Sequence, residues 1–406
     1  MPVRMDQVLP LAKRPSAPRP WVWAVLLMLF LLLAGGAEML FAEHPMHERP
    51  LMSWGMALGG ALLGWCLLMM GRVLLFLGQH RAADGWDQAR EQEWAEKMAQ
   101  GRRFMQVLKV SLYTALRAPG QTPEAQVAAL LKGTKVIKTQ PSWRGEATRH
   151  SRLWDDQKQA PEENLLDALN LVLTELSETL ALLPDDTPLA VMLESDSGLP
   201  EAVLSRLWHQ AWSDSGIRQP TSEVQGRGLD GVDQWLDQRS EDRSLLLVVA
   251  FQVAPEQPID TAEAIAALLL SNPQTPSAPA PKAYLHRPQQ ALEASREAWT
   301  CAVDQSLQWA SAQATTIERI WRVGSNPQQE QTINAVMADL PMVHDHNVHY
   351  VDSLLGHPGK VSPWLAVAVA VQGIEQGIGT QIIFSGSSDS TAFWSTVVTA
   401  ASAREI

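Results

Sequence analysis

Cysteine is scarce in this sequence: its 406 residues include only Cys66 and Cys301. Cys66 lies inside a long apolar segment, so we do not expect the two thiols to meet. A framework of structural disulfides is therefore excluded, which is typical of proteins from a reducing compartment.

Basic runs and nucleotide-binding motifs are missing as well. No dense run of Lys and Arg interrupts a net charge of -12, so the summed field disfavours nucleic acid as a partner. No dinucleotide-binding glycine pattern follows a strand predicted from the sequence, and there is no P-loop lysine. The segment Ser385–Ser388 lacks the Gly-x-Ser-x-Gly elbow of hydrolases and is predicted as a turn between strands. We therefore expect no cofactor.

Two long apolar segments, 21–41 and 51–71, stand out near the N-terminus. Each has about 20 residues, the length with which a helix crosses roughly 30 Å of hydrocarbon. They predict a transmembrane helix hairpin over 21–77, preceded by an N-terminal tail of residues 1–20. In an alternative interpretation, residues 21–34 belong to a cleaved signal peptide, and the second segment still anchors the chain.

Basic residues predict the orientation of this hairpin. Arg14 and Arg19 are among those that precede the first segment, and Arg72 and Arg81 are among those that follow the second. The loop between the segments carries only Arg49. The positive-inside rule then places both termini and the large body in the cytoplasm, at a bacterial inner membrane.

Beyond the hairpin, the sequence predicts a connecting region over 78–184 and then an α/β domain over 185–406. Residues 86–116 have the mixed spacing of a helix, with a break expected near Gly101. Residues 117–160 are rich in Pro, Gly and Thr, as in an irregular linker, and carry one short helical stretch, 123–131. From residue 185 apolar strands alternate with helices, and a Pro-rich break separates two such halves, 185–275 and 282–406. This pattern predicts an internal duplication of sheets covered on both faces.

The periodicity of apolar residues assigns the elements of these regions. Helices are predicted over 162–183, 199–213, 231–238, 289–314, 328–340 and 362–376. Strands are predicted over 189–194, 244–251, 262–271, 283–287, 316–324, 380–386 and 390–400. Strand 244–251, SLLLVVAF, is apolar throughout, as expected of a strand that is buried on both faces.

Local motifs in both halves resemble those of β-ketoacyl synthases, which have the thiolase-like fold. Gly356-His357 precedes an Ala-rich helix, as does the Gly-His loop whose histidine is catalytic in that family. In the first half, LDGVDQWLDQ followed by SLLLVVAF resembles the helix and central strand after the family's nucleophile. IIFSGSSDSTAFW is similar to the family's glycine-rich turn between the last two strands. The resemblance covers about 185–402 and implies an α/β fold: two transmembrane helices followed by a duplicated thiolase-like α/β/α/β/α domain.

The chain departs from that family where the family's chemistry lies. A condensing enzyme needs a cysteine at the start of the first-half helix, where this sequence reads VQGRGLDG. Cys301 is predicted within the long helix of the second half, and Asp352 stands where the family has a lysine before the Gly-His pair. Because no acyl-enzyme forms without a thiolate, we predict a degenerate, non-catalytic copy. His357 is the one candidate for a catalytic residue.

The densest polar cluster contains His344, His346 and His349. Neutral imidazoles bind zinc and other transition metals. Along a strand, however, His344 and His346 would share one face and His349 would not, so the spacing matches no standard metal site. We predict a polar loop with surface histidines, and these three residues are the only candidates for metal ligands.

A membrane hairpin followed by a degenerate thiolase-like body is similar to accessory proteins encoded with the lipase effectors of bacterial type VI secretion. The resemblance implies two partners, the lipid bilayer and a secreted effector protein. We therefore expect a membrane-anchored adaptor without catalytic activity. Two alternatives stay open: a membrane-bound acyltransferase or condensing enzyme that uses His357, and a module that binds acyl chains or lipids in the cavity left by a lost active site.

Overall fold

The computed structural model describes residues 3, 5, 8–41, 50–154, 160–275, 278–291, 293–338, 347–386 and 392–401. The chain divides into two compact units. One comprises Arg4–Lys97, and the other comprises Met98–Ile406 together with Met1–Val3. Each unit is described by itself.

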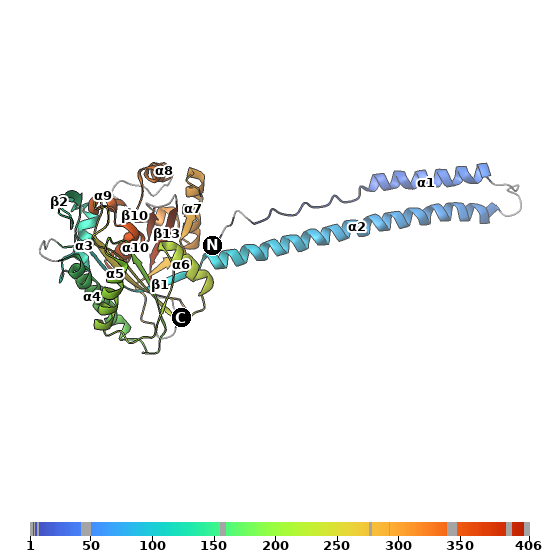
Figure 1. Cartoon of the computed structure of the whole chain (residues 1–406). Helices are drawn as coiled ribbons and strands as arrows, with labels where there is room; N and C mark the ends of the chain where they lie inside the picture. The colour runs from blue at the N-terminus through green and yellow to red at the C-terminus, as the bar shows by residue number, and fades with distance from the viewer. Residues whose placement is uncertain are drawn as a thin grey trace. The chain divides into compact units, whose positions relative to one another are not determined.

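The first unit consists of helix α1 (Pro20–Phe41) and most of helix α2 (Pro50–Gly101). The two helices lie side by side (Figure 1), and the indole N–H of Trp65 donates to the carbonyl oxygen of Trp23 at 2.9 Å. Both helices are long and apolar enough to cross a membrane, by length and composition. Helix α2 continues beyond its apolar segment to Gly101, because no proline interrupts residues 72–100.

The second unit is built on an eleven-stranded mixed sheet. The strands pair in the order β11-β10-β12-β13-β8-β1-β7-β6-β4-β5, and β9 pairs with β13. Their bounds are β1 (Phe104–Thr114), β4 (Leu189–Ser195), β5 (Thr221–Glu223), β6 (Leu245–Gln252), β7 (Ala264–Ser271), β8 (Ala283–His286), β9 (Gln289–Ala291), β10 (Arg319–Val323), β11 (Val348–Tyr350), β12 (Gln381–Ser385) and β13 (Phe393–Ala400).

The sheet contains one topology twice. Strands β1, β4, β5, β6 and β7 form an N-terminal half, and β8, β10, β11, β12 and β13 form a C-terminal half. In each half the spatial order is third, second, fourth, fifth and first strand, with the fifth antiparallel to both neighbours. The two first strands, β1 and β8, pair antiparallel and join the halves. The duplication expected from the sequence is therefore present in the strand order.

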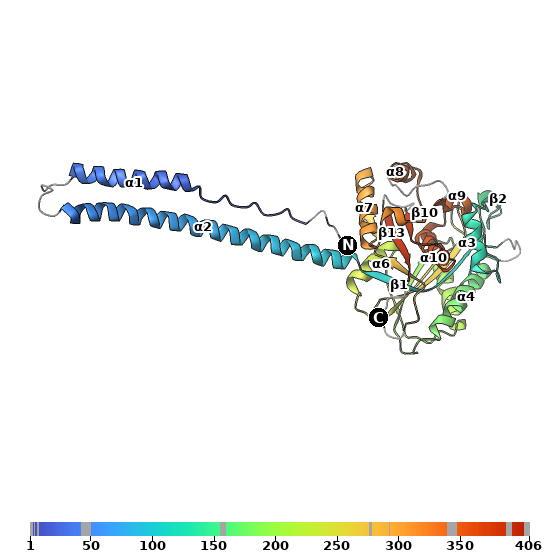
Figure 2. The same ribbon diagram turned by 180° about the vertical axis from the view of Figure 1, so that it is seen from behind.

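Helices cover both faces of each half. Helices α4 (Pro161–Leu180) and α5 (Glu201–Asp214) pack on the outer face of the N-terminal half, and α7 (Arg296–Trp309) and α8 (Pro327–Met337) pack on that of the C-terminal half. Figure 2 shows α4 and α7 on opposite sides of this unit. Between the halves lie α6 (Gly228–Gln238) and α10 (Ser362–Glu375), whose side chains share one core with both halves. The result is an α/β/α/β/α layering.

The smaller elements close the ends of these layers. Helix α3 packs on α10, and β2 and β3 form a separate two-stranded sheet. Their bounds, with those of helix α9 and two 3₁₀ turns, are α3 (Pro123–Leu131), β2 (Lys138–Pro141), β3 (Ala147–His150), α9 (Val351–Leu355), η1 (Ala314–Thr316) and η3 (Gly359–Val361).

The segment before residue 185 differs most from expectation. The helix predicted over 86–116 ends at Gly101, where a break was expected. Residues 104–114 form strand β1 at the centre of the sheet, so the prediction of helix was wrong for the part after the break. Within residues 117–160, α3 forms at the short helical stretch predicted over 123–131, and the β2–β3 hairpin forms where irregular structure was predicted. The helix predicted over 289–314 is shortened to α7, because the Ser295 hydroxyl accepts the N–H of Ala298 and begins the helix there.

Candidate functional site between the two halves

A cavity of about 450 Å³ lies between the two halves. The end of β4 and the start of α6 form its N-terminal wall. The loop before α10 and the facing ends of β12 and β13 form its C-terminal wall. The charged and imidazole side chains that line it are Glu194, Asp196, Arg227, Asp230, His357 and Lys360.

His357 lies where a loop of the C-terminal half meets the N-terminal half. Its backbone N–H donates to the carbonyl oxygen of Asp260 at 2.8 Å, and its own carbonyl accepts the N–H of Ala262 at 3.0 Å. Gly356 permits this approach, since its φ is 99° and a Cβ there would collide with the backbone of Thr261. The Gly-His pair therefore has an architectural role, whatever its chemistry.

The imidazole of His357 is held in one tautomer. The backbone N–H of Gly359 donates to Nδ1 of His357 at 3.0 Å. Nδ1 therefore carries no proton, and in the neutral ring the proton is assigned to Nε2. Such a ring can donate an N–H to an oxyanion, but its Nδ1 lone pair is already engaged. This geometry suits polarising or binding an oxygen atom, and not general-base activation of a nucleophile.

The start of α6, where the ketosynthase resemblance requires a nucleophile, is occupied by a carboxylate. Oε1 of Glu194 accepts the backbone N–H of Gly228 at 2.8 Å and the indole N–H of Trp364 at 2.9 Å. Burial raises the pKa of Glu194, while both hydrogen bonds and the charges of Lys360 and Arg227 oppose that rise. The donor at the helix N-terminus that would hold an anion is thus satisfied within the chain.

The residues around the start of α6 also form a Gly-x-Gly-x-x-Gly pattern, from Gly226 to Gly231. It follows β5, a three-residue strand with no strand-like periodicity in its sequence, which explains why the pattern was not predicted to follow a strand. A Cβ at Gly226 or Gly231 would lie 2.6 or 2.8 Å from the sulfur of Met192. These glycines make room for Met192, and Gly228 already donates to Glu194, so the pattern offers no phosphate cradle.

Neither cysteine lines this cavity. Cys66 lies in α2, and Cys301 is exposed on α7, beside a different cavity of about 470 Å³. Asp352 is also outside the lining: it is a partly exposed residue on α9 with a buried carboxylate, which accepts the N–H of Gly324 at 2.9 Å. Burial raises the pKa of Asp352 to about 7. Of the residues singled out by the ketosynthase resemblance, His357 lines this cavity, and Cys301 and Asp352 do not.

Of the three histidines predicted as metal candidates, only His349 belongs to the described residues; His344 and His346 lie outside them. His349 is on β11, with its ring 4.7 Å from that of Trp321. Burial, reinforced by the charge of Arg319, lowers the pKa of His349 to about 4. Within the described part of the chain, no three or more His, Cys, Asp or Glu side chains form a group that could hold a metal.

No protein-family profile and no curated protein matches this sequence. Its fold matches solved ketosynthases. The PfaC keto synthase–chain length factor aligns with 74% of this chain at 11% identity and a TM-score of 0.53, but this chain spans only 43% of its length.

Two further structures align over their whole length or nearly so. The ishigamide ketosynthase/chain length factor is 13% identical, with 74% of this chain and 100% of its own covered and a TM-score of 0.53. The ketosynthase ApeO in complex with its chain length factor ApeC, from Xenorhabdus doucetiae, is 12% identical, with 74% and 98% covered and a TM-score of 0.53. At such identities the likeness shows a thiolase-like fold and no chemistry.

Proposed function

We propose that this protein is a membrane-anchored adaptor without catalytic activity, whose thiolase-like body binds a protein partner in the bacterial cytoplasm. The observation that carries the proposal is the carboxylate of Glu194 at the start of α6. In an acyl-transfer enzyme that position must be open to a thiolate and an oxyanion. Here the chain fills it, and neither cysteine lines the cavity. The fold can then serve recognition, since function depends on the site and not on the fold.

The anchor rests on the surface of α1 and α2. Apolar side chains along both helices are exposed, and Leu32 and Leu40 reach 72% and 80%. A continuous apolar surface of this length is stable against lipid and not against water. Together with the basic residues on both flanks, it supports a hairpin in the inner membrane with both termini in the cytoplasm.

The partner in this proposal is a lipase effector secreted by a type VI system. Its support is the layout of the chain, a hairpin followed by a thiolase-like body, which is similar to accessory proteins encoded with such effectors. The adaptor would hold the effector at the membrane before export. Its recognition surface is then independent of His357.

The test is co-purification of the full-length protein with a co-expressed type VI lipase effector. Tagged protein is extracted in a mild non-ionic detergent, and an unrelated inner-membrane hairpin protein serves as the control bait. We expect the effector to be recovered with wild type and with His357→Ala, and not with the control bait. Absence of the effector from both eluates, with acyl-carrier proteins recovered instead, would refute the adaptor.

A second candidate is a membrane-bound acyltransferase or condensing enzyme. It is favoured by one observation, the Nε2–H tautomer of His357 at the edge of a cavity. Full-length protein incubated with octanoyl-CoA and malonyl-CoA distinguishes the two candidates. We expect neither product nor a covalent adduct by mass spectrometry. Turnover that disappears in His357→Ala would establish the enzyme, whereas saturable octanoyl-CoA binding without turnover would favour a lipid- or acyl-binding module.

A further inference from the structure

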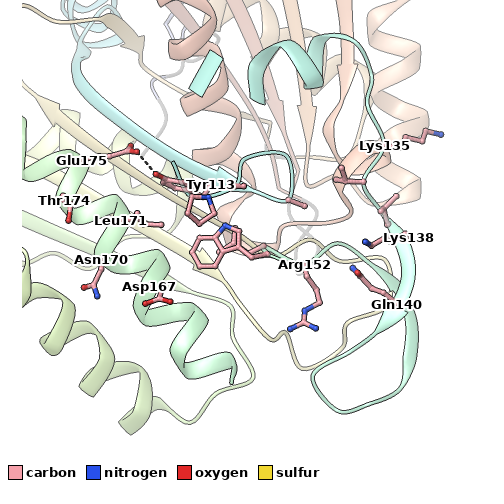
Figure 3. A pocket seen from close by; sticks show the side chains of 17 residues that line it. Tyr113, Lys135, Lys138, Gln140, Arg152, Asp167, Asn170, Leu171, Thr174 and Glu175 are labelled. Carbon is pink, nitrogen blue, oxygen red and sulfur yellow. Dashed lines mark hydrogen bonds between the residues drawn. The ribbon is translucent and has the colours of Figure 1, made fainter. Parts of the chain in front are cut away.

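A second cavity, of about 1270 Å³, lies in the N-terminal half (Figure 3). Its walls are α4, the end of β1, residues 135–140 and residues 152–154. It shares no lining residue with the cavity between the halves. Nothing in the proposed function uses it.

Arg152 is the buried charge of this second cavity. The residue is 8% exposed, and among the described residues no acceptor lies within hydrogen-bond distance of its Nε or Nη2. Its guanidinium stacks on Trp143, with Cζ 3.6 Å from the ring centroid. The stacking fixes the plane of the guanidinium and leaves its Nε and Nη2 without an acceptor among the described residues. A buried, unpaired guanidinium is costly, so an anion from outside the chain would be strongly favoured there.

The carboxylates of the cavity do not supply that anion. Glu175 accepts hydrogen bonds from Ser111, Tyr113 and Arg117 at 2.6, 2.7 and 2.6 Å, so its charge is already balanced. Asp167 lies on α4, across the cavity from Arg152 (Figure 3). Lys135 and Lys138 also line the cavity, so its lining combines cationic side chains with the carboxylates of Asp167 and Glu175.

Apolar and aromatic groups complete the lining. The rings of Tyr113 and Trp154 meet edge to face at 6.5 Å, and Leu153 and Leu171 lie beside them. The indole N–H of Trp154 has no hydrogen-bond acceptor among the described residues. A second donor thus lies on the same wall segment as Arg152. Few convergent polar groups in an apolar cavity are typical of small-molecule sites.

We infer that this cavity binds a small organic monocarboxylate with an aromatic or aliphatic body. The carboxylate pairs with the guanidinium of Arg152 in a charge-assisted contact. The body of the ligand packs against Tyr113, Trp154 and Leu171. This assignment does not depend on the adaptor role.

The first test compares two ligands that differ only in charge. Full-length protein in a non-ionic detergent is titrated with 4-phenylbutyrate and with its neutral amide, 4-phenylbutanamide, and binding is followed by ligand-observed NMR. We expect saturable binding of the acid, about tenfold or more tighter than that of the amide, as for a hydrogen bond to a charged group. Equal affinities, or no saturable binding of the acid, would overturn the inference.

A third arm separates a free acid from an acidic protein segment. The dipeptide N-acetyl-Glu-Phe-amide presents the same two groups on a peptide backbone. We expect it to bind more weakly than 4-phenylbutyrate. Tighter binding of the dipeptide would refute the small-molecule assignment.

The second test replaces Arg152 with methionine, and Arg149→Met is the matched control because Arg149 is exposed and pairs with Asp260. We expect Arg152→Met to lose the preference for the acid and the control to keep it. Without ligand, Arg152→Met should melt at the same or a higher temperature than the control, since an unpaired buried charge is removed. A clearly lower melting temperature, or a retained preference for the acid, would make Arg152 a structural residue and contradict the site.

Discussion

The two cavities of the thiolase-like body treat their buried polar groups differently. Between the halves, Glu194 is held by Gly228 and Trp364, and Nδ1 of His357 is held by Gly359. In the N-terminal half, Arg152 is buried with two of its nitrogens unpaired among the described residues. In the first cavity Oε1 of Glu194 and Nδ1 of His357 are held by the chain, whereas in the second a buried guanidinium keeps two nitrogens without an acceptor among the described residues.

The two cavities therefore differ in which of their buried polar groups have hydrogen-bond partners within the chain. In the cavity between the halves, Glu194 and Nδ1 of His357 already have partners, so a ligand that binds these atoms must compete with them. In the second cavity, Nε and Nη2 of Arg152 have no acceptor among the described residues. One fold can host many functions. A buried polar group without a hydrogen-bond partner is therefore a better guide to a binding site than the position of the active site in proteins of similar fold.

The largest expected effect concerns Asp352, which adjoins the Gly-His loop. Burial raises its pKa to about 7 in the folded state, against about 3.8 for the ordinary value. A raised carboxyl pKa contributes stability that is fully present below about pH 4 and is lost as the pH rises through about 7. The loss amounts to roughly 4 kcal/mol at 1.36 kcal/mol per pKa unit.

Asp352→Asn should therefore abolish this loss, because the amide has no charged form and its oxygen still accepts the N–H of Gly324. Urea unfolding of both proteins at several pH values measures it, with the exposed Asp186→Asn as the control. Relative to Asp352→Asn, wild type and the control should lose stability as the pH rises toward neutral, because all three proteins share the other titrating groups. Parallel pH curves for all three proteins would show that Asp352 is not held protonated.

The next prediction tests whether polar groups of the cavity between the halves are hydrogen-bonded by other residues of the chain. Glu194→Ala should cost about 3 kcal/mol, because it leaves the N–H groups of Gly228 and Trp364 buried without an acceptor. Glu194→Gln keeps an oxygen at that position and should cost about 1 kcal/mol. Chemical unfolding gives both values.

Acetate sharpens the same comparison. It should raise the melting temperature of Glu194→Ala, where it can replace the lost carboxylate at the helix N-terminus, and leave wild type unchanged. If wild type gains as much as the variant, the cavity is open to anions and the contrast between the two cavities fails.

Much of the α/β body could be predicted from local pattern. Strand β6 is apolar along its length and is buried throughout, as strand 244–251 was predicted to be. Helix α10 was predicted from its Ala- and Val-rich run, and every residue from Ser362 to Ile374 is buried. The apolar composition of each element is enough to predict that it is buried, so no contact with a distant residue is needed to assign it.

Strand β1 could not be assigned in the same way. Its register places Val107 against Leu270 in β7 and against Ala283 in β8, both far along the chain. The spacing of its polar residues is disturbed by a β-bulge between Val107 and Lys109, which imitates helical periodicity. Its position comes from long-range pairing, which no sequence window contains.

The site was predicted only in part for the same reason. His357 was found because Gly356-His357 is a contiguous motif. Glu194 was missed because its carboxylate meets Gly228 across 34 positions, and Arg152 because its burial depends on packing against Trp143. Contacts between distant residues decide which charges a cavity satisfies.

A smaller effect is expected in the second cavity at Glu175, whose carboxylate already accepts several hydrogen bonds. Tyr113→Phe removes one of the three donors to Glu175 and should cost about 1 kcal/mol, because Ser111 and Arg117 remain. Tyr350→Phe is the control, since the Tyr350 hydroxyl lies at a long 3.5 Å from Oδ1 of Asn334 and the side chain is exposed. A loss above about 3 kcal/mol would mean that Glu175 depends on Tyr113 alone.

The smallest effect is expected at Cys301. A small effect there is informative, because an activated thiolate would give a large one. The thiol is exposed on α7 and lies outside both cavities, so Cys301→Ser should change stability by about 0.5 kcal/mol or less. Iodoacetamide should label Cys301 at the rate of an ordinary exposed thiol, and the labelled protein should still bind the effector and 4-phenylbutyrate like wild type. Labelling much faster than that of glutathione, or loss of either binding, would reveal an activated thiolate and reopen acyl transfer, because an acyl-enzyme needs that nucleophile.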